Sequence, residues 1–239
     1  MSMQTIPKHI AIIMDGSGRW AERRMLPRVA GHPRGVDAAR ATVQYCIDHN
    51  ISALTLFAFS SENWQRPAAE VKLLMTLLQK LLIEEAHQLN DNNVKLLVIG
   101  DMSRLSLPLQ AAIQDAHNLT ANNTGLHLNI ALNYGGRWDI VQATRKICSA
   151  VANGEITASD INDSLFAQYL TLSDLPDPDL LIRTSGEQRV SNFLLWQLAY
   201  TELYFTSTLW PDFNKQDLDA ALEFYAQRHR RFGLVEEHV

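Results

Sequence analysis

The sequence contains few of the features that would indicate secretion or membrane insertion. Its 239 residues include two cysteines, Cys46 and Cys148, and both lie in apolar patterns with helical spacing. We therefore expect buried, reduced thiols rather than a disulfide framework. The apolar run at residues 10–14 is far too short for a signal peptide or a membrane span. These absences predict a cytoplasmic protein with membrane contact of a peripheral kind only.

Positive charge is not in excess either. Lysine and arginine number 21 against 26 aspartate and glutamate residues, which gives a formal net charge of -5. Such a chain has no overall attraction to nucleic acid or to anionic lipid, so we predict no nucleic-acid partner. Any site for an anionic ligand must therefore be local.

The chain also lacks internal repeats, low-complexity tracts and Gly/Ser linkers, which favours one domain over residues 1–239. Apolar runs predict strands at 9–14, 53–60, 94–100, 126–133 and 179–184. Helical spacing predicts helices at 36–50, 67–90, 106–121, 136–152, 191–200 and 215–231. This alternation predicts an α/β fold with a central, mostly parallel sheet covered by helices on both faces. In such sheets ligands bind beyond the carboxyl ends of the strands.

The predicted helix 67–90 is apolar on more than one side. One stripe consists of Val71, Leu74, Leu78, Leu81 and Leu82, and a second face of Leu73, Leu77 and Ile83. A helix of this kind must be covered on more than one side. Two interpretations are open: burial between the sheet and a partner subunit, or the wall of a hydrophobic channel for a long apolar ligand.

The first polar cluster follows the strand at 9–14. Gly16 and Gly18 permit a tight turn and a close approach of the backbone to a ligand, and a helix that starts near Gly18 would add an anion site. The side chains that could bind phosphate oxygens are those of Arg19, Arg28 and His32. Asp15 would repel a bare diphosphate, so a divalent cation such as Mg²⁺ between them is the simplest arrangement. The alternative is a β-turn with a surface arginine cluster.

Three further clusters follow later elements. The loop 59–67 offers Ser60, Ser61, Glu62, Asn63, Trp64 and Arg66, although a helix cap alone would explain its serines and asparagine. The stretch 183–193 forms a second anion site with Arg183, Arg189 and Ser191. Glu202 lies in an apolar setting, where a carboxylate needs a hydrogen bond, an ion pair or a metal. The tail at 228–233 reads most simply as a solvated basic end of the last helix.

Two arginine-rich anion sites, carboxylates for a cation and an apolar helix form a consistent set. They point to a reaction between two phosphorylated substrates, at least one of which has an apolar tail.

Several long strings of the sequence resemble the cis-prenyltransferase family, and within it the bacterial undecaprenyl diphosphate synthases. They are HIAIIMDGSGRWA, LTLFAFSSENWQRP, LNIALNYGGRWDIV, LIRTSGEQRVSNFLLWQLAYTELYF and LWPDF, and the resemblance extends from His9 to Gly233. It implies repeated condensation of isopentenyl diphosphate onto farnesyl diphosphate, with a cis double bond formed each time. The implied product is undecaprenyl diphosphate, which becomes the lipid carrier for peptidoglycan synthesis. The implied protein is an Mg²⁺-dependent homodimer with a hydrophobic tunnel at the carboxyl ends of the strands.

The resemblance also implies roles for single residues. Asp15 matches the essential aspartate that binds Mg²⁺ and assists departure of the allylic diphosphate, and Glu202 matches a second metal-linked carboxylate. The allylic diphosphate site corresponds to Gly16, Ser17, Gly18, Arg19, Trp20, Arg28 and His32. The isopentenyl diphosphate site corresponds to Arg183, Arg189, Val190 and Ser191. Asn63 matches the residue proposed to take the proton, with Ser60, Ser61, Glu62, Trp64 and Arg66 as substrate contacts.

Further implications concern the tail, the tunnel and product release. Arg231 and Gly233 match a tail motif that reaches the phosphates of the partner subunit. The helix 67–90, with Leu126 and Leu128, would wall the tunnel, and release of the apolar product calls for contact with a membrane or detergent.

The chain departs from the family at one position. The family pattern is Asp-Gly-Asn-Gly, whereas this chain has Ser17 in place of the asparagine. This leaves a homologue of reduced activity, a non-catalytic partner subunit and a shorter-chain synthase as alternatives. A phosphohydrolase of the haloacid-dehalogenase type is disfavoured, because it needs a second aspartate where Ser17 stands.

Overall fold

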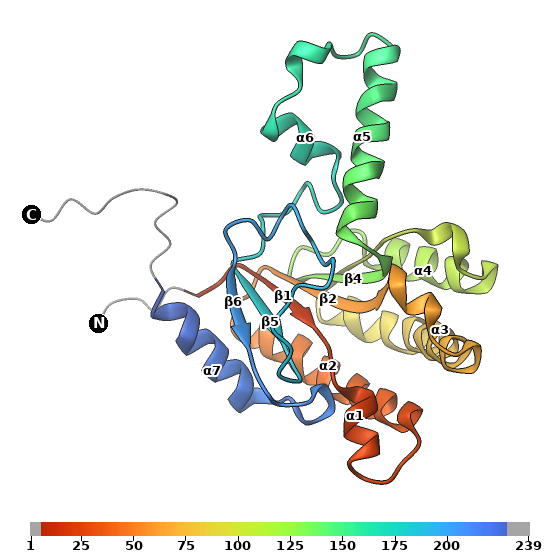
Figure 1. Cartoon of the computed structure of the whole chain (residues 1–239), viewed down its shortest axis with the longest axis vertical. Helices are drawn as coiled ribbons and strands as arrows, with labels where there is room; N and C mark the ends of the chain where they lie inside the picture. The colour runs from red at the N-terminus through yellow and green to blue at the C-terminus, as the bar shows by residue number, and fades with distance from the viewer. Residues whose placement is uncertain (1–5, 229–239) are drawn as a thin grey trace, which may run out of the picture.

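The fold is described from a computed structural model in which residues 6–228 are placed (Figure 1). Six strands form one sheet in the order β3-β4-β2-β1-β5-β6, and each neighbouring pair is parallel. The strands are β1 (His9–Ile13), β2 (Ala53–Ser60), β3 (Lys95–Ile99), β4 (His127–Tyr134), β5 (Leu180–Arg183) and β6 (Glu202–Phe205). The predicted single-domain α/β fold with a parallel sheet is confirmed.

Within residues 6–228, seven α-helices connect or follow these strands. They are α1 (Ser17–Glu22), α2 (Gly31–Asp48), α3 (Ala68–Asp91), α4 (Leu107–Thr120), α5 (Gly136–Ala152), α6 (Asp163–Tyr169) and α7 (Lys215–Ala226). Short 3-10 helices include η1 (Arg28–Ala30), η2 (Ser61–Gln65), η3 (Met102–Arg104), η4 (Ala158–Asp160) and η5 (Trp210–Asp212). None of the helices within residues 6–228 has both the length and the apolarity needed to cross a membrane.

Side chains of β1 alternate between two hydrophobic cores, as expected for a strand buried on both faces. Ile10 and Ile12 pack in the core that includes side chains of α2 and α7. Ala11 and Ile13 pack on the opposite face, in a core that contains Phe193 and Leu194. One face of the sheet is therefore covered by helices, and this part of the other face by the segment after β5.

That segment corrects the predicted helix at 191–200, which the structure forms as turns. Ser191, Asn192 and Leu194 all have positive φ angles, which an α-helix does not permit. The carbonyl oxygen of Asn192 accepts a hydrogen bond from Gly136 N at 2.6 Å, so this backbone group joins the turn between β4 and α5. Two of the apolar residues that suggested a helix, Phe193 and Leu194, are buried in the core without forming one.

Other expectations need smaller corrections. The helix predicted at 36–50 begins five residues earlier, at Gly31, and the described part of the helix predicted at 215–231 ends at Ala226. Neither α6 nor β6 was predicted. Cys46 is buried, which raises the pKa of its thiol to about 12, whereas Cys148 is exposed and not buried as expected.

Candidate active site

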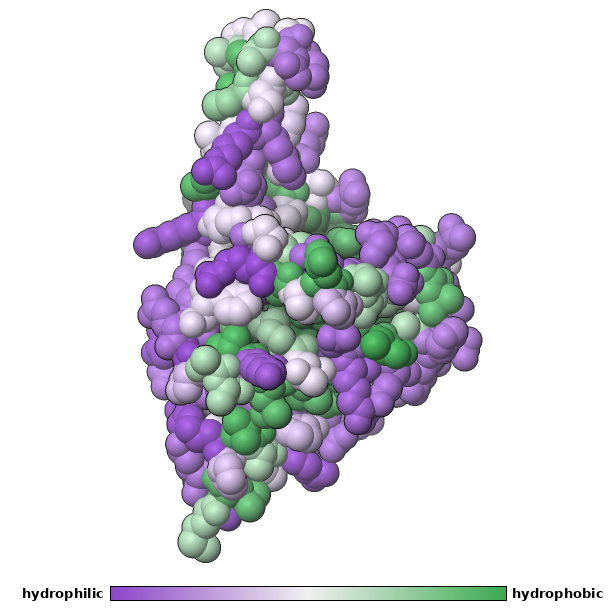
Figure 2. All heavy atoms as spheres, turned by 90° about the vertical axis from the view of Figure 1, so that its right-hand side faces the viewer, coloured by the Kyte–Doolittle hydropathy of each residue, from purple (hydrophilic) through white to green (hydrophobic). Residues whose placement is uncertain are grey.

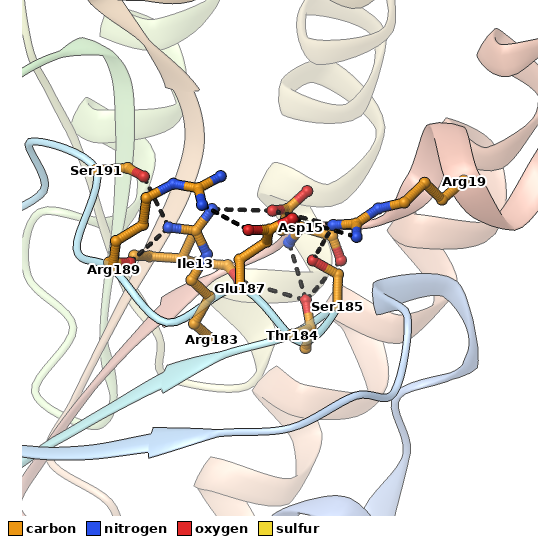
Figure 3. Close-up of polar contacts among 9 residues, drawn as sticks. All are labelled: Ile13, Asp15, Arg19, Arg183, Thr184, Ser185, Glu187, Arg189 and Ser191. Carbon is orange, nitrogen blue, oxygen red and sulfur yellow. Dashed lines mark hydrogen bonds and ion pairs between the residues drawn. The ribbon is translucent and has the colours of Figure 1, made fainter.

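The carboxyl ends of β1 and β5 bring the first and third polar clusters together. Ile13 and Arg183 are partners in the parallel register of these strands, so the residues after β1 lie beside the end of β5. Arg183 Nη2 lies 3.0 Å from Asp15 Oδ2 (Figure 3). Two stretches 168 positions apart in the sequence thus form one site.

Thr184 fixes the backbone at Asp15. The Thr184 hydroxyl accepts a hydrogen bond from Asp15 N at 2.9 Å and donates one to Asp15 O at 2.6 Å. Thr184 is fully buried, so this double contact is shielded from water. It holds the aspartate at the end of the strand while its carboxylate stays partly exposed.

The carboxylate of Asp15 is held in its ionised form. Burial favours the neutral acid, but hydrogen bonds from Arg183 and Ser185 and the positive charges of Arg183 and Arg19 outweigh it, so the pKa of Asp15 is lowered. Arg19 Nη2 lies 3.5 Å from Asp15 Oδ2 and also bonds the Ser185 hydroxyl. A site that combines an ionised carboxylate with two guanidinium groups can bind a cation through the carboxylate and an anion through the guanidinium groups.

Glu187 lies between two arginines that the sequence assigned to different anion sites. Its carboxylate accepts from Arg19 Nη1 at 3.4 Å and from Arg189 Nη1 at 2.5 Å (Figure 3). Glu187 was not predicted as a site residue, although it stands within the stretch 183–193. The Glu187 carboxylate oxygens thus accept from guanidinium groups to which the oxygens of a diphosphate could bind instead.

Arg183 links this site to the neighbouring loop. Its Nη1 donates to the Ser191 hydroxyl at 2.7 Å and to Arg189 O at 2.5 Å. Its Nε is buried and has no hydrogen-bond partner among the described residues. A buried donor without an acceptor is costly, so this guanidinium is suited to bind a further anion.

The glycines after β1 allow close approaches. Gly16 has a φ of +109°, and a Cβ at this position would lie 2.9 Å from Leu209. A Cβ at Gly18 would lie 2.8 Å from Arg28 Nη2, so the absence of a side chain lets this guanidinium reach the start of α1. Helix α1 begins at Ser17, so a helix does start near Gly18, the condition under which the sequence suggested an anion site here.

Glu70 connects two more of the predicted cations. It lies 3.2 Å from Arg66 Nη1 and 4.0 Å from His32 Nε2, and it was not predicted. Burial lowers the pKa of His32, and the nearby Arg66 and Arg28 lower it further against the opposing effect of Glu70. The imidazole is therefore predominantly neutral at pH 7, and a bound anion would favour its protonation.

The loop after β2 forms a helix cap, which was the alternative to a substrate-binding role for this loop. Asn63 Oδ1 accepts from Ser60 N at 3.1 Å, and the Ser60 hydroxyl accepts in return from the backbone of Asn63. Trp64 donates from Nε1 to Asn133 Oδ1 at 2.7 Å and packs against Phe59. Capping and packing thus explain much of this loop, while Ser60 and Asn63 also face the cavity.

A cavity of about 680 Å³ extends from these polar groups beneath the sheet. Its mouth contains Asp15 and Arg183, and its walls come from α2, α3 and the middle of β2, β3 and β4. The apolar wall residues include Val36, Ala39, Val43, Ile47, Leu74, Leu77, Leu78, Leu81, Leu82, Leu89, Leu96, Val98, Leu128 and Ile130. Along α3 the lining from Leu74 to Leu89 corresponds to about 22 Å at the usual rise of an α-helix.

This cavity refines two expectations about the tunnel. Its mouth is at the carboxyl ends of the strands, but its body runs toward their amino ends, as far as Val94 just before β3. Leu128 lines it, whereas Leu126 is buried elsewhere in the same core and does not. On α3, Leu77 lines the cavity, while Leu73 and Ile83 of the second apolar face are 43% and 59% exposed.

The cavity separates the predicted site residues into two groups. Those that line it are Asp15, Gly16, Ser17, Gly18, Arg19, Arg28, His32, Ser60, Asn63, Arg66, Arg183 and Ser191. Those that do not are Trp20, Ser61, Glu62, Trp64, Arg189, Val190 and Glu202. Trp20 is buried and donates to Asp212 at 2.7 Å, so its contacts in the structure are those of a packing residue. Arg231 and Gly233 lie outside the described residues.

Glu202 does not join Asp15 within one chain. It is paired with Leu180 at the amino end of β5, whereas Asp15 follows the carboxyl end of β1. Its carboxylate is bound by Arg228 Nε at 3.0 Å. Within residues 6–228 no group of three or more metal-binding side chains is present. Of the two carboxylates predicted to bind a metal, Asp15 lies at the mouth and Glu202 does not.

Comparison with known proteins decides the family. Residues 13–233 match the family described as "Putative undecaprenyl diphosphate synthase". The chain belongs to this undecaprenyl diphosphate synthase family. Two relatives are each named as a (2E,6E)-farnesyl-diphosphate-specific ditrans,polycis-undecaprenyl-diphosphate synthase. The protein from Coxiella burnetii is 55% identical over 98% of this chain and 99% of its own, and that from Vibrio cholerae is 54% identical over 100% and 96%.

Solved structures of the synthase family share the fold. Lavandulyl diphosphate synthase from Lavandula x intermedia, crystallised with dimethylallyl diphosphate, superposes with a TM-score of 0.92 at 42% identity, covering 95% of this chain and 98% of its own. A probable undecaprenyl diphosphate synthase from Campylobacter jejuni gives a TM-score of 0.80 at 34% identity, covering 97% and 100%. Because these two proteins carry names for different products, the shared fold alone does not determine the product of this chain.

Proposed function

We propose that this member of the synthase family is a cis-prenyltransferase that adds isopentenyl diphosphate repeatedly to farnesyl diphosphate and makes undecaprenyl diphosphate. The observation that carries this proposal is the continuity between an arginine-rich mouth and an apolar cavity that about 22 Å of helix α3 lines. A diphosphate at the mouth would place its prenyl chain in the cavity, where the chain can lengthen. The names of the close relatives support the same substrate and product.

The two diphosphates would bind on either side of Asp15. Arg19, Arg28 and His32 surround the start of α1 and suit the allylic diphosphate. Arg183, Arg189 and Ser191 suit isopentenyl diphosphate, with the buried Arg183 Nε as an unpaired donor within the described part of the chain. Fixing both substrates next to each other makes the condensation effectively unimolecular.

The residues at the mouth also fit Mg²⁺. This ion is usually held by one or two carboxylates together with substrate phosphates, and Asp15 supplies one ionised, partly exposed carboxylate. When bound there, Mg²⁺ would offset the negative charge that develops on the leaving diphosphate. Arg19 and Arg28 would stabilise the same charge by hydrogen bonds that strengthen as the bond to the allylic carbon breaks.

The proton lost in each condensation must leave from the mouth. We assign Asn63 to this step, together with Ser60, since both line the cavity there. Asn63 Oδ1 already accepts a hydrogen bond from Ser60 N. The amide N–H groups of Asn63 would therefore donate to a phosphate oxygen or a water molecule, and that oxygen would take the proton.

Further parts of the proposal concern the whole protein. We propose that residues 1–239 form a single catalytic domain that acts in the cytoplasm as a homodimer, with product for peptidoglycan synthesis released through peripheral contact with a membrane. Glu202 lies away from Asp15 of its own chain, so a metal-linked role for it would require a second subunit.

The decisive experiment is incorporation of radiolabelled isopentenyl diphosphate in the presence of farnesyl diphosphate, Mg²⁺ and detergent. Chromatography of the dephosphorylated product should give a chain of 55 carbons, which follows from the proposed product name, and Asp15→Ala should nearly abolish incorporation. Absence of product from correctly folded wild-type protein would refute catalysis. Shorter chains as the main product would favour the shorter-chain alternative.

A further inference from the structure

The loop between α1 and η1 presents apolar side chains to solvent. Residues 22–28 are all exposed, with Met25 at 95% and Leu26 at 44%. The loop is nevertheless held by backbone hydrogen bonds, from Met25 N to Glu22 O at 3.0 Å and from Leu26 N to Ala21 O at 2.9 Å. Met25 has a φ of +56°, a left-handed conformation that closes this turn. The turn therefore presents Met25 at its outside rather than burying it.

The same loop is positively charged on a negatively charged chain. Residues 22–28 contain three arginines and one glutamate, which gives a formal charge of +2 against -5 for the whole protein. Arg24 lies over the Trp20 ring at 4.1 Å and near Asp212 at 3.3 Å, so its direction is fixed beside the apolar tip. The loop thus combines basic residues with exposed apolar ones.

The loop also lies next to the mouth of the cavity. Arg19 precedes it and Arg28 ends it, and both line the cavity. In Figure 1 it forms the lowest part of the described chain, below α1. Figure 2 shows apolar side chains at this lowest point of the molecule, followed upward by further apolar surface.

We propose that residues 22–28 dock the protein on an anionic lipid bilayer, with Met25 and Leu26 inserted among the acyl chains and with Arg23 and Arg24 at the headgroups. This combination of basic and apolar residues is typical of interfacial membrane binding. A protein partner is disfavoured because two projecting side chains offer far less than the roughly 800 Å² per side of a stable interface. The inference rests on the proposed function, since a product with a long apolar tail has to pass from the cavity into lipid.

The test is sedimentation of the full-length protein with vesicles, without any substrate. Wild-type protein should bind vesicles that contain phosphatidylglycerol and bind vesicles of phosphatidylcholine alone much more weakly. The double variant Met25→Ser/Leu26→Ser should bind the anionic vesicles at least about tenfold more weakly, because two apolar side chains no longer insert. Arg23→Gln should lower the affinity about fivefold and reduce its dependence on salt.

Ile161→Ser is the matched control, because Ile161 is 43% exposed and follows η4, on the arm that Figure 1 shows at the opposite end of the molecule. Its vesicle binding should equal that of the wild type. All variants keep the basic residues after 227, so any contribution from them is the same in each. Equal binding by the double variant and the wild type, or no binding by the wild type, would overturn the proposal.

A second measurement separates this proposal from the proposed function. In detergent, the double variant should condense the substrates at the wild-type rate, because the loop's two apolar residues do not line the cavity. With anionic vesicles in place of detergent, its first turnover should be unchanged and its later turnovers slower. If neither protein makes product in detergent, the proposed function fails while the vesicle-binding result still stands on its own.

Discussion

Asn192 donates a hydrogen bond from Nδ2 to Glu62 Oε1 at 2.8 Å and so joins two loops that are 130 positions apart in the sequence. Its Oδ1 accepts from Arg137 N at 2.9 Å, which fixes the same amide on the start of α5. Ser191, the adjacent residue, belongs to the proposed isopentenyl diphosphate site, and Asn63 follows Glu62. Asn192 therefore sets the position of two substrate loops without lining the cavity itself.

Removing this amide should impair catalysis through misplaced loops. We expect Asn192→Gly to lower kcat/KM for isopentenyl diphosphate about tenfold, since a hydrogen bond to a carboxylate contributes roughly 1.5–3 kcal/mol and part of it can be replaced by water. Glycine is the suitable replacement because Asn192 has a φ of +63°. Steady-state kinetics with each substrate varied in turn provide the measurement.

Glu62 supplies the control for this prediction. If the two residues act through their mutual hydrogen bond, Glu62→Ala should cause a similar loss, and the double variant should be much less impaired than the two losses combined. Fully additive losses would mean that each residue acts independently.

The alternation of strands and helices was sufficient to predict the parallel sheet. The five predicted strands agree with β1 to β5 within about two residues, because continuous apolar runs are characteristic of strands buried on both faces. The segment 191–200 was wrongly predicted because its apolar spacing is helical, whereas Asn192 uses its backbone and side chain to hold other loops. Such long-range polar contacts override local propensity and leave no local pattern.

The same distinction applies to the site. Asp15, Arg19 and Arg183 could be predicted because each lies at or shortly after the carboxyl end of a strand, at the same edge of the sheet. Glu187 and Glu70 were missed, since a carboxylate that pairs with arginines in space looks like any surface acid in the sequence. The placement of Glu202 depends on the order of β5 and β6 in the sheet, and β6 was not predicted at all.

The serine at position 17 should limit the rate. Ser17 lines the cavity as the first residue of α1, where the family pattern has asparagine. Asparagine supplies two N–H donors on a longer side chain, and a contact with a charged diphosphate contributes roughly 1.5–3 kcal/mol. If that contact forms only in the transition state, Ser17→Asn should raise kcat on the order of ten- to a hundredfold. Single-turnover kinetics measure the chemical step directly.

Ser17→Ala is the comparison for this experiment. It removes the hydroxyl and should not exceed the wild-type rate. Equal rates for serine and asparagine at this position would show that the family asparagine contributes no specific contact with the diphosphate.

The cavity wall should determine the length of the product. Ala39 of α2 lines the cavity between the mouth and its far end, so Ala39→Phe should block the growing chain and shorten the product. Leu89 lies near the end of α3 that is farther from the mouth, so Leu89→Ala should extend the cavity and lengthen the product. Chromatography of the dephosphorylated products gives the chain lengths directly.

Leu73→Phe is the matched control, because Leu73 is on α3 but is exposed and does not line the cavity. Its product distribution should equal that of the wild type. Unchanged products from both cavity variants would show that the shape of this cavity does not determine the chain length of the product.

Stability should depend on the neutral state of His9. Its Nδ1 lies 2.7 Å from Pro176 O, which can only accept, so Nδ1 carries the hydrogen and Nε2 accepts from the Thr55 hydroxyl at 2.7 Å. Thr55 Oγ1 also accepts a hydrogen bond from Asn129 Nδ2. If Nε2 of His9 were protonated, the Thr55 hydroxyl could no longer donate to it and would have to accept a second hydrogen bond. Burial accordingly lowers the pKa of His9, although Pro176 and Asp179 oppose this shift.

The sign of the effect follows from this direction. The unfolded chain takes up a proton on His9 near pH 6.5, whereas the folded protein resists protonation to lower pH, so stability is full above about pH 6.5 and falls as the pH drops toward the folded pKa. The contribution of this one group has a slope of up to about 1.4 kcal/mol per pH unit. Urea unfolding at several pH values between 5 and 8 measures it. Because His32 and His127 also have lowered pKa values, the comparison must be with His9→Gln, in which only the contribution of His9 is lost. An equally steep loss of stability in His9→Gln would assign the pH dependence to those other histidines.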